Sequence, residues 1–214
     1  MNYPNLFHEK SLWKKGYKRI ASLDEAGRGP LAGPVTAAVV VIKGYSENDF
    51  KNISLRDSKK LSPRKRQAFY SIITKNPGIE WAVVSVSEKT IDRINILQAT
   101  KLAMEKAIQK LKKKPDFLII DGNFEIKSNV PQRSIIKADE RVLSCTMASI
   151  IAKVTRDRLM ERYHKRFLNY GFNQHKGYLT KYHLKMLKKN GPCSIHRQSF
   201  RPIKSSLRKT IEKN

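Results

Sequence analysis

Residues 19–42 read RIASLDEAGRGPLAGPVTAAVVVI, two apolar runs joined by a glycine-rich turn, and this stretch decides the fold. The first run ends at the acidic pair Asp24 and Glu25. The second run, residues 35–42, has eight residues, which favours a buried strand and is too short to cross a bilayer. Between the two runs lie residues 26–34, which we call the glycine corner. The stretch predicts two neighbouring strands with carboxylates at the end of the first.

The chain that follows alternates between helix and strand patterns. Ser62 followed by Pro63 is typical of a helix start. Thr90 is expected to cap a second helix, which ends in a lysine run before Pro115. The remaining predicted elements are strands over 80–87, 117–120 and 134–137 and helices over 140–167 and 182–189. This order predicts an α/β fold with a mixed five-stranded sheet flanked by helices.

The net charge of the chain is strongly positive. Its 214 residues include 44 Lys and Arg against 18 Asp and Glu, which gives a formal net charge of +26. Residues 151–214 alone hold 17 basic and 3 acidic residues, which indicates a basic helical C-terminal extension. Such a surface concentrates polyanions, so nucleic acid is the expected partner. The alternative is a lysine-rich proteome in which this charge serves no special ligand.

Length and hydropathy limit the class of protein. With 40% hydrophobic residues and no clear linker or repeat, we expect a single domain over residues 1–214, acting as a monomer. The N-terminal residues lack a hydrophobic signal core, and the two cysteines, Cys145 and Cys193, form no metal or disulfide pattern. We interpret both thiols as inert. These features predict a cytoplasmic protein with no membrane segment.

Four carboxylates stand where predicted strands end. They are Asp24, Glu25, Asp121 and Asp139. Strand ends of one sheet converge in space, and carboxylates gathered there repel one another unless a divalent cation neutralises them. Oxygen ligands favour Mg²⁺ or Mn²⁺, and two such ions suit phosphodiester hydrolysis. The alternatives remain open at this point: a helix cap at Asp139, a turn at Asp121, and solvated charge at the first strand's end.

Seven motifs resemble ribonuclease HII, the prokaryotic type 2 ribonuclease H, in the same order along the chain. These motifs are DEAGRGPLAGPV at 24–35, DSKKLS at 57–62, IIDG at 119–122, KAD at 137–139, ASIIAKVTRDR at 148–158, HKGY at 175–178 and HRQSF at 196–200. The resemblance covers about Tyr17 to Pro202. Ala138 departs from the glycine usual in bacterial members, and CTMAS at 145–149 departs from their alanine-rich run. The related ribonuclease HIII has an extra N-terminal domain and a different glycine corner, and this chain has neither.

The resemblance implies an RNase H-like fold, with a catalytic core over about 17–168 and a substrate-binding helical region over about 169–214. It implies an endoribonuclease that cuts the RNA strand of RNA–DNA hybrids and nicks 5′ to single ribonucleotides in duplex DNA, leaving 5′-phosphate and 3′-OH ends. That activity serves replication and DNA repair. It also implies that the four carboxylates are catalytic ligands of Mg²⁺ or Mn²⁺.

The resemblance further implies that the glycine corner reads the ribonucleotide 2′-OH through Gly27, Arg28 and Gly29, and that Tyr178 stacks on the sugar after the cut. A tight turn and ordinary half-buried packing are the alternatives for these two features. Candidates for phosphate contacts are Lys59, Lys60, Lys153 and Arg156, with solvated surface charge as the alternative. Two other classes stay open: a different nuclease of the same fold, and an RNA-binding protein that cleaves nothing.

Overall fold

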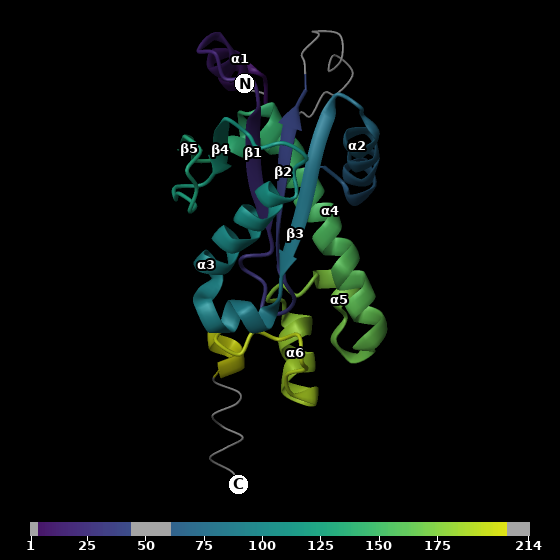
Figure 1. Ribbon diagram of the computed structural model, residues 1–214. Helices are drawn as coiled ribbons and strands as arrows, with labels where there is room; N and C mark the ends of the chain where they lie inside the picture. The colour runs from purple at the N-terminus through teal and green to yellow at the C-terminus, as the bar shows by residue number, and fades with distance from the viewer. Residues whose placement is uncertain (1–3, 44–60, 205–214) are drawn as a thin grey trace.

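The computed structural model describes residues 4–43 and 61–204, which build a five-stranded sheet flanked by helices (Figure 1). The strands are β1 (Ile20–Ala26), β2 (Val35–Ile42), β3 (Ile79–Val86), β4 (Phe117–Asp121) and β5 (Gln132–Ile135). They lie in the order β3-β2-β1-β4-β5. β2 runs antiparallel to both β1 and β3, whereas β1, β4 and β5 are parallel. The predicted α/β fold with a mixed five-stranded sheet is confirmed.

Helices cover both faces of this sheet. They are α1 (Phe7–Lys14), α2 (Pro63–Lys75), α3 (Glu88–Gln109), α4 (Leu143–Arg166), α5 (Phe172–His175) and α6 (Lys181–Asn190). α3 packs on one face through small side chains such as Ala99 and Ala103, and α4 packs on the other through Met147 and Ile151. β2 is buried along its whole length because it lies between these two layers. α5 and α6 gather at the end of the sheet where β3 terminates (Figure 1).

Two helix starts differ from the sequence predictions. α3 is capped by Ser87, whose hydroxyl accepts a hydrogen bond from the Thr90 backbone N–H, so Thr90 lies inside the helix. α3 also ends at Gln109, before the lysine run. α4 begins at Leu143, three residues after the predicted start at about residue 140, and a separate 3-10 helix over Ala138–Glu140 precedes it.

Other elements shift or were missed. β5 lies two residues earlier than predicted, because Lys137 takes a left-handed backbone (φ 57°) that ends extended pairing and begins the 3-10 helix. Sequence patterns gave no sign of α1, which is fixed by the buried Glu9: its carboxylate accepts hydrogen bonds from the Ser144 N–H and hydroxyl. Among the described residues, no helix is long and apolar enough to cross a membrane.

Candidate active site

Strand register brings two of the four acids together. β1 and β4 are parallel neighbours in which Leu23 pairs with Ile120. The next residues, Asp24 and Asp121, therefore lie side by side where β4 ends, although β1 continues to Ala26 and does not end at the acidic pair as predicted. The third acid, Asp139, arrives from the 3-10 helix, and one carboxylate oxygen of each of the three lies within 4.8 Å of the others. These three carboxylates, which we call the acidic trio, form a group able to hold a cation.

Local hydrogen bonds hold Asp139 at this place. One Asp121 carboxylate oxygen accepts from the Ala138 backbone N–H at 2.8 Å, which ties the 3-10 helix to the end of β4. The Thr146 hydroxyl donates to the Asp139 backbone carbonyl at 2.7 Å, which ties the same helix to α4. The bend begins at Lys137, whose left-handed backbone turns the chain back toward the sheet. Alanine at position 138 is fully buried and fits this arrangement.

The electrostatics of the site favour a bound cation. Burial raises the pKa of Asp24 well above its usual value, and the charges of Glu25, Asp121 and Asp139 raise it further. Burial also raises the pKa of Glu25 to about 7, against the opposing effect of Arg28, whose guanidinium lies 3.3 Å from the Glu25 carboxylate. The buried Glu25 Oε2 has no hydrogen-bond partner within the described chain. Clustered carboxylates that repel one another, beside a buried oxygen without a hydrogen-bond donor, fit a hard divalent cation.

Predicted substrate-contact residues line a pocket next to the acids. Its walls include Glu25, Gly27, Lys153 and Tyr178. Tyr178 is 41% exposed, and the Lys153 ammonium lies 5.5 Å from its ring centroid. The Lys153 ammonium also pairs with the Asp157 carboxylate at 2.8 Å. Lys59 and Lys60 lie outside the described residues.

A chain of histidines holds the backbone at Tyr178. The Nδ1–H of His183 donates to the Tyr178 carbonyl at 2.9 Å, and its Nε2 accepts from His196 Nε2–H at 3.1 Å. His196 Nδ1 in turn accepts from the Cys193 N–H at 2.9 Å. Burial lowers the pKa of both His183 and His196 to about 4, so both rings are neutral at pH 7 and each nitrogen has a defined role. Tyr178 is therefore an exposed side chain on a backbone that these hydrogen bonds hold in place.

The prediction that Arg156 contacts phosphate is wrong. Its side chain is completely buried, and its guanidinium donates to the backbone carbonyls of Ala32, Pro34 and Lys176 at 3.0–3.2 Å. An arginine can be buried when carbonyl oxygens accept its N–H groups, because those hydrogen bonds replace water. Arg156 is therefore a positioning residue that joins the glycine corner to α4 and to the segment before Tyr178.

Arg197 is a second positioning residue, and sequence reasoning assigned it no role. It is completely buried and donates to the carbonyls of Gly27, Arg28 and Gly33 at 2.6, 2.8 and 3.0 Å. Burial, and after it the charge of Arg156, lowers its pKa to about 9, so it remains charged at neutral pH. The sequence signal that could have identified Arg197 was its place in the HRQSF motif. Together the two residues form what we call the arginine clamp under the glycine corner.

Gly27 and Gly29 differ in what surrounds them. Gly27 has a left-handed backbone (φ 97°), and a Cβ there would lie 2.0 Å from Arg156 Nε and 2.8 Å from the Pro34 carbonyl oxygen. A Cβ on Gly29 would meet nothing within 4 Å. The fold therefore requires glycine at position 27 and does not require it at position 29.

Comparison with known proteins identifies the family of this chain. The model of the Ribonuclease HII family matches residues 21–203. A curated Ribonuclease HII from Chlamydia muridarum is 48% identical over 211 residues, which cover 96% of this chain and 95% of that protein. The solved ribonuclease H2 from Pyrococcus horikoshii has a TM-score of 0.75 and 26% identity, covering 92% of this chain and all of the other. A PCNA:RNase HII complex from Archaeoglobus fulgidus matches with a TM-score of 0.72 and 27% identity, covering 85% and 95%. On this evidence the chain belongs to the ribonuclease HII family.

Proposed function

We propose that this chain, in addition to the ribonuclease H activity on RNA–DNA hybrids that its family indicates, nicks duplex DNA 5′ to single ribonucleotides, leaving 5′-phosphate and 3′-OH ends. The observation that carries the proposal is the acidic trio next to a pocket lined by the glycine corner and Tyr178. Such an enzyme serves ribonucleotide removal during DNA replication and repair. We further propose that it acts as a cytoplasmic monomer, with its core over 17–168 and residues 169–214 binding substrate.

The proposed cation ligands are the acidic trio together with Glu25. Bound Mg²⁺ or Mn²⁺ would supply an activated water and charge stabilisation for the departing oxygen. The chain's own residues set the geometry: strand register fixes Asp24 beside Asp121, and the 3-10 helix adds Asp139. Arg28 pairs with the Glu25 carboxylate, which lines the pocket.

We propose that the main chain of the glycine corner, and not a side chain, recognises the 2′-OH. The arginine clamp uses the carbonyls of residues 27, 28, 32, 33 and 34, so the corner is fixed before substrate arrives. Gly29 leaves open space in which a sugar can approach the main chain. The 2′-OH is the group that distinguishes a ribonucleotide from a deoxyribonucleotide at one position. A fixed corner that meets this hydroxyl selects RNA without reading the base.

The proposal is tested with a duplex DNA that contains one ribonucleotide. We expect a single nick 5′ to that ribonucleotide with Mg²⁺ or Mn²⁺, and no product in EDTA, as measured by denaturing gel electrophoresis. The control is the same duplex without the ribonucleotide, which should remain intact. Equal cutting of both duplexes would indicate a different nuclease of the same fold. Binding without cutting in any metal would indicate an RNA-binding protein.

Tyr178→Ala is expected to slow nicking at the single ribonucleotide by about tenfold to a hundredfold, because an aromatic stacking contact contributes about 1–3 kcal/mol. Tyr178→Phe keeps the ring and should retain most of the activity. Phe7→Ala is the control, since Phe7 is an exposed aromatic residue on α1, outside the proposed substrate-binding region. Single-turnover kinetics measure the rates, and thermal melting checks the fold. If Tyr178→Ala and Phe7→Ala nick at the same rate, the stacking role of Tyr178 is refuted.

A further inference from the structure

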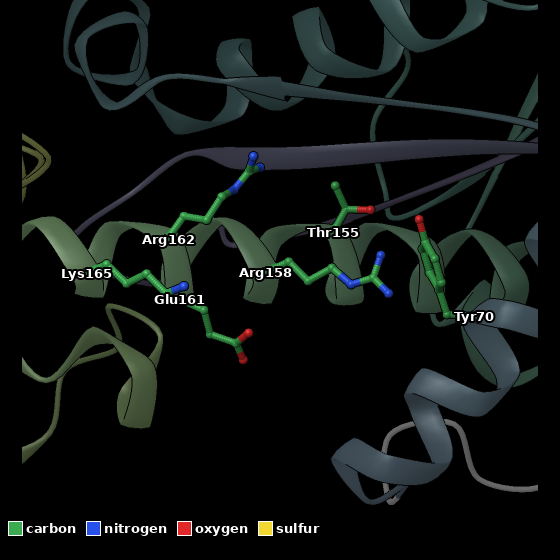
Figure 2. A pocket seen from close by; sticks show the side chains of 6 residues that line it. All are labelled: Tyr70, Thr155, Arg158, Glu161, Arg162 and Lys165. Atoms are coloured by element: carbon green, nitrogen blue, oxygen red, sulfur yellow. The ribbon is translucent and has the colours of Figure 1, made fainter.

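A basic groove runs along α4, leading away from the candidate active site. The residues of this α4 groove, which α2 and α4 supply, are Arg66, Tyr70, Thr155, Arg158, Arg162 and Lys165. Thr155, Arg158, Arg162 and Lys165 are three, four and three positions apart, which places them along one face of the helix. Figure 2 shows Arg158 extending along α4 toward Tyr70, while Glu161 points away from Arg162.

The groove has an excess of positive charge that the described acidic residues do not neutralise. Its two acids are already paired: Asp157 with the Lys153 ammonium at 2.8 Å, and Glu161 with the Lys176 ammonium at 2.9 Å. Within the described ranges, no carboxylate lies at ion-pair distance from Arg158, Arg162 or Lys165. All three of these side chains are exposed. The groove therefore presents unneutralised cations to solvent.

Two groups in the groove are arranged as donors. The Arg158 guanidinium lies 4.5 Å from the centroid of the Tyr70 ring. This stacking fixes the plane of the guanidinium and leaves its edge N–H groups able to bind phosphate oxygens in pairs. The Thr155 hydroxyl oxygen is buried and has no hydrogen-bond partner among the described residues. A hydroxyl and a planar cation on one helix face suit a phosphodiester.

The groove is continuous with the candidate active site. Arg66 lines both the pocket beside Glu25 and the next hollow along α4. Arg158 lines that hollow and also the outermost one, which ends at Lys165. From Lys153 to Lys165 the helix rises about 18 Å, the length of about five base pairs of duplex. A duplex held at the acidic trio would have its flank near this surface, which favours nucleic acid over an acidic protein as the occupant.

We propose that the α4 groove binds the sugar–phosphate backbone of the substrate duplex, about five base pairs long, on one side of the cleaved bond. This rests on the proposed function, because it assumes that the duplex is held at the acidic trio. The groove contributes affinity that does not depend on sequence and that falls with salt.

The test compares two variants that each remove two positive charges. The first, Arg158→Ala with Arg162→Ala, changes the groove. The control, Lys106→Ala with Lys110→Ala, changes α3 and the residue that follows it, on the other face of the sheet. Fluorescence anisotropy in EDTA measures binding of an uncut hybrid from about 50 to about 200 mM salt. We expect the groove variant to bind about tenfold more weakly than wild type and its slope of log affinity against log salt to fall by about 2. The control variant should change each quantity far less.

Substrate length provides the second arm of the test. Two hybrids are compared, each with one arm shortened to about three base pairs, on opposite sides of the cleavage position. Because the groove lies on one side of that position, one of the two hybrids leaves the groove empty. Wild-type protein should lose affinity for that hybrid, and the groove variant should not lose any further. Equal effects of the groove and control variants, or equal length dependence in wild type and groove variant, would overturn the proposal. Wild-type cleavage of the full hybrid with Mg²⁺ is measured separately, so failure of the proposed function is distinguishable from failure of the groove.

Discussion

Asp24→Asn is expected to abolish detectable cleavage, while the protein should melt at a higher temperature than wild type. The loss of activity follows because an amide is a poor ligand for Mg²⁺ or Mn²⁺ and removes one of three converging carboxylates. The gain in stability follows because Asp24 is buried, and burial together with three neighbouring acids raises its pKa. Asparagine keeps the oxygen that accepts the Glu25 N–H at 2.6 Å.

The sign of the pH dependence distinguishes this explanation from simple repacking. A carboxyl group whose pKa is raised on folding destabilises the folded protein above its unfolded pKa, because ionisation favours the unfolded chain. The melting difference between Asp24→Asn and wild type should therefore be large near about pH 8 and shrink steadily as the pH falls to about 3, below the unfolded pKa of about 3.9, where Asp24 is mostly neutral in both states. EDTA is present throughout, so that no cation stabilises the wild type.

The control is Asp116→Asn, because the Asp116 carboxylate accepts hydrogen bonds from the backbone N–H groups of Lys18 and Arg19, away from the acidic trio. Asp116→Asn should retain wild-type cleavage without melting higher. A pH-independent rise in the melting temperature of Asp24→Asn would contradict the electrostatic account, and a large fall would show that the Asp24 carboxylate is needed for folding.

The sheet was predictable from the sequence because its strands are marked by composition. β2 is eight apolar or β-branched residues long, and Gly33-Pro34 marks its start. The convergence of Asp24 and Asp121 was also predictable, since each follows an apolar run and the parallel pairing of β1 with β4 aligns the two runs, although β1 continues past Asp24 to Ala26. Asp139 was placed correctly near a strand end, but the 3-10 helix that carries it depends on a left-handed Lys137, a conformation that lysine does not signal.

Long-range burial was the part that the sequence did not reveal. Arginine is ordinarily exposed, so Arg156 was read as a surface cation, and the carbonyls that accept its hydrogen bonds come from the glycine corner and from Lys176. Likewise the Glu9 carboxylate binds Ser144, 135 residues away. Local periodicity contains no information about such partners, because they meet only when the sheet has formed.

Gly27→Ala and Gly29→Ala should separate the structural role of the glycine corner from its role in substrate recognition. At position 27 an added methyl group would overlap Arg156 Nε and the Pro34 carbonyl oxygen, on a left-handed backbone. We expect Gly27→Ala to lose about 3 kcal/mol of unfolding free energy, a fall in melting temperature of about 6–12 °C, and about a hundredfold or more in nicking rate. Both stability and nicking rate should fall, because the added methyl group displaces the arginine clamp.

Gly29→Ala should melt within about 1 °C of wild type, because nothing lies near its added methyl group and its backbone is not left-handed. Its nicking of the single-ribonucleotide duplex should still fall by about tenfold or more, because the methyl group occupies the space in which the sugar approaches the main chain. Thermal melting and single-turnover nicking of both variants, measured side by side, provide the comparison. Wild-type nicking by Gly29→Ala would refute the close approach at position 29. If Gly27→Ala melts at the same temperature as wild type, the arginine clamp can move to accommodate the methyl group. The claim that a fixed corner selects RNA would then be refuted.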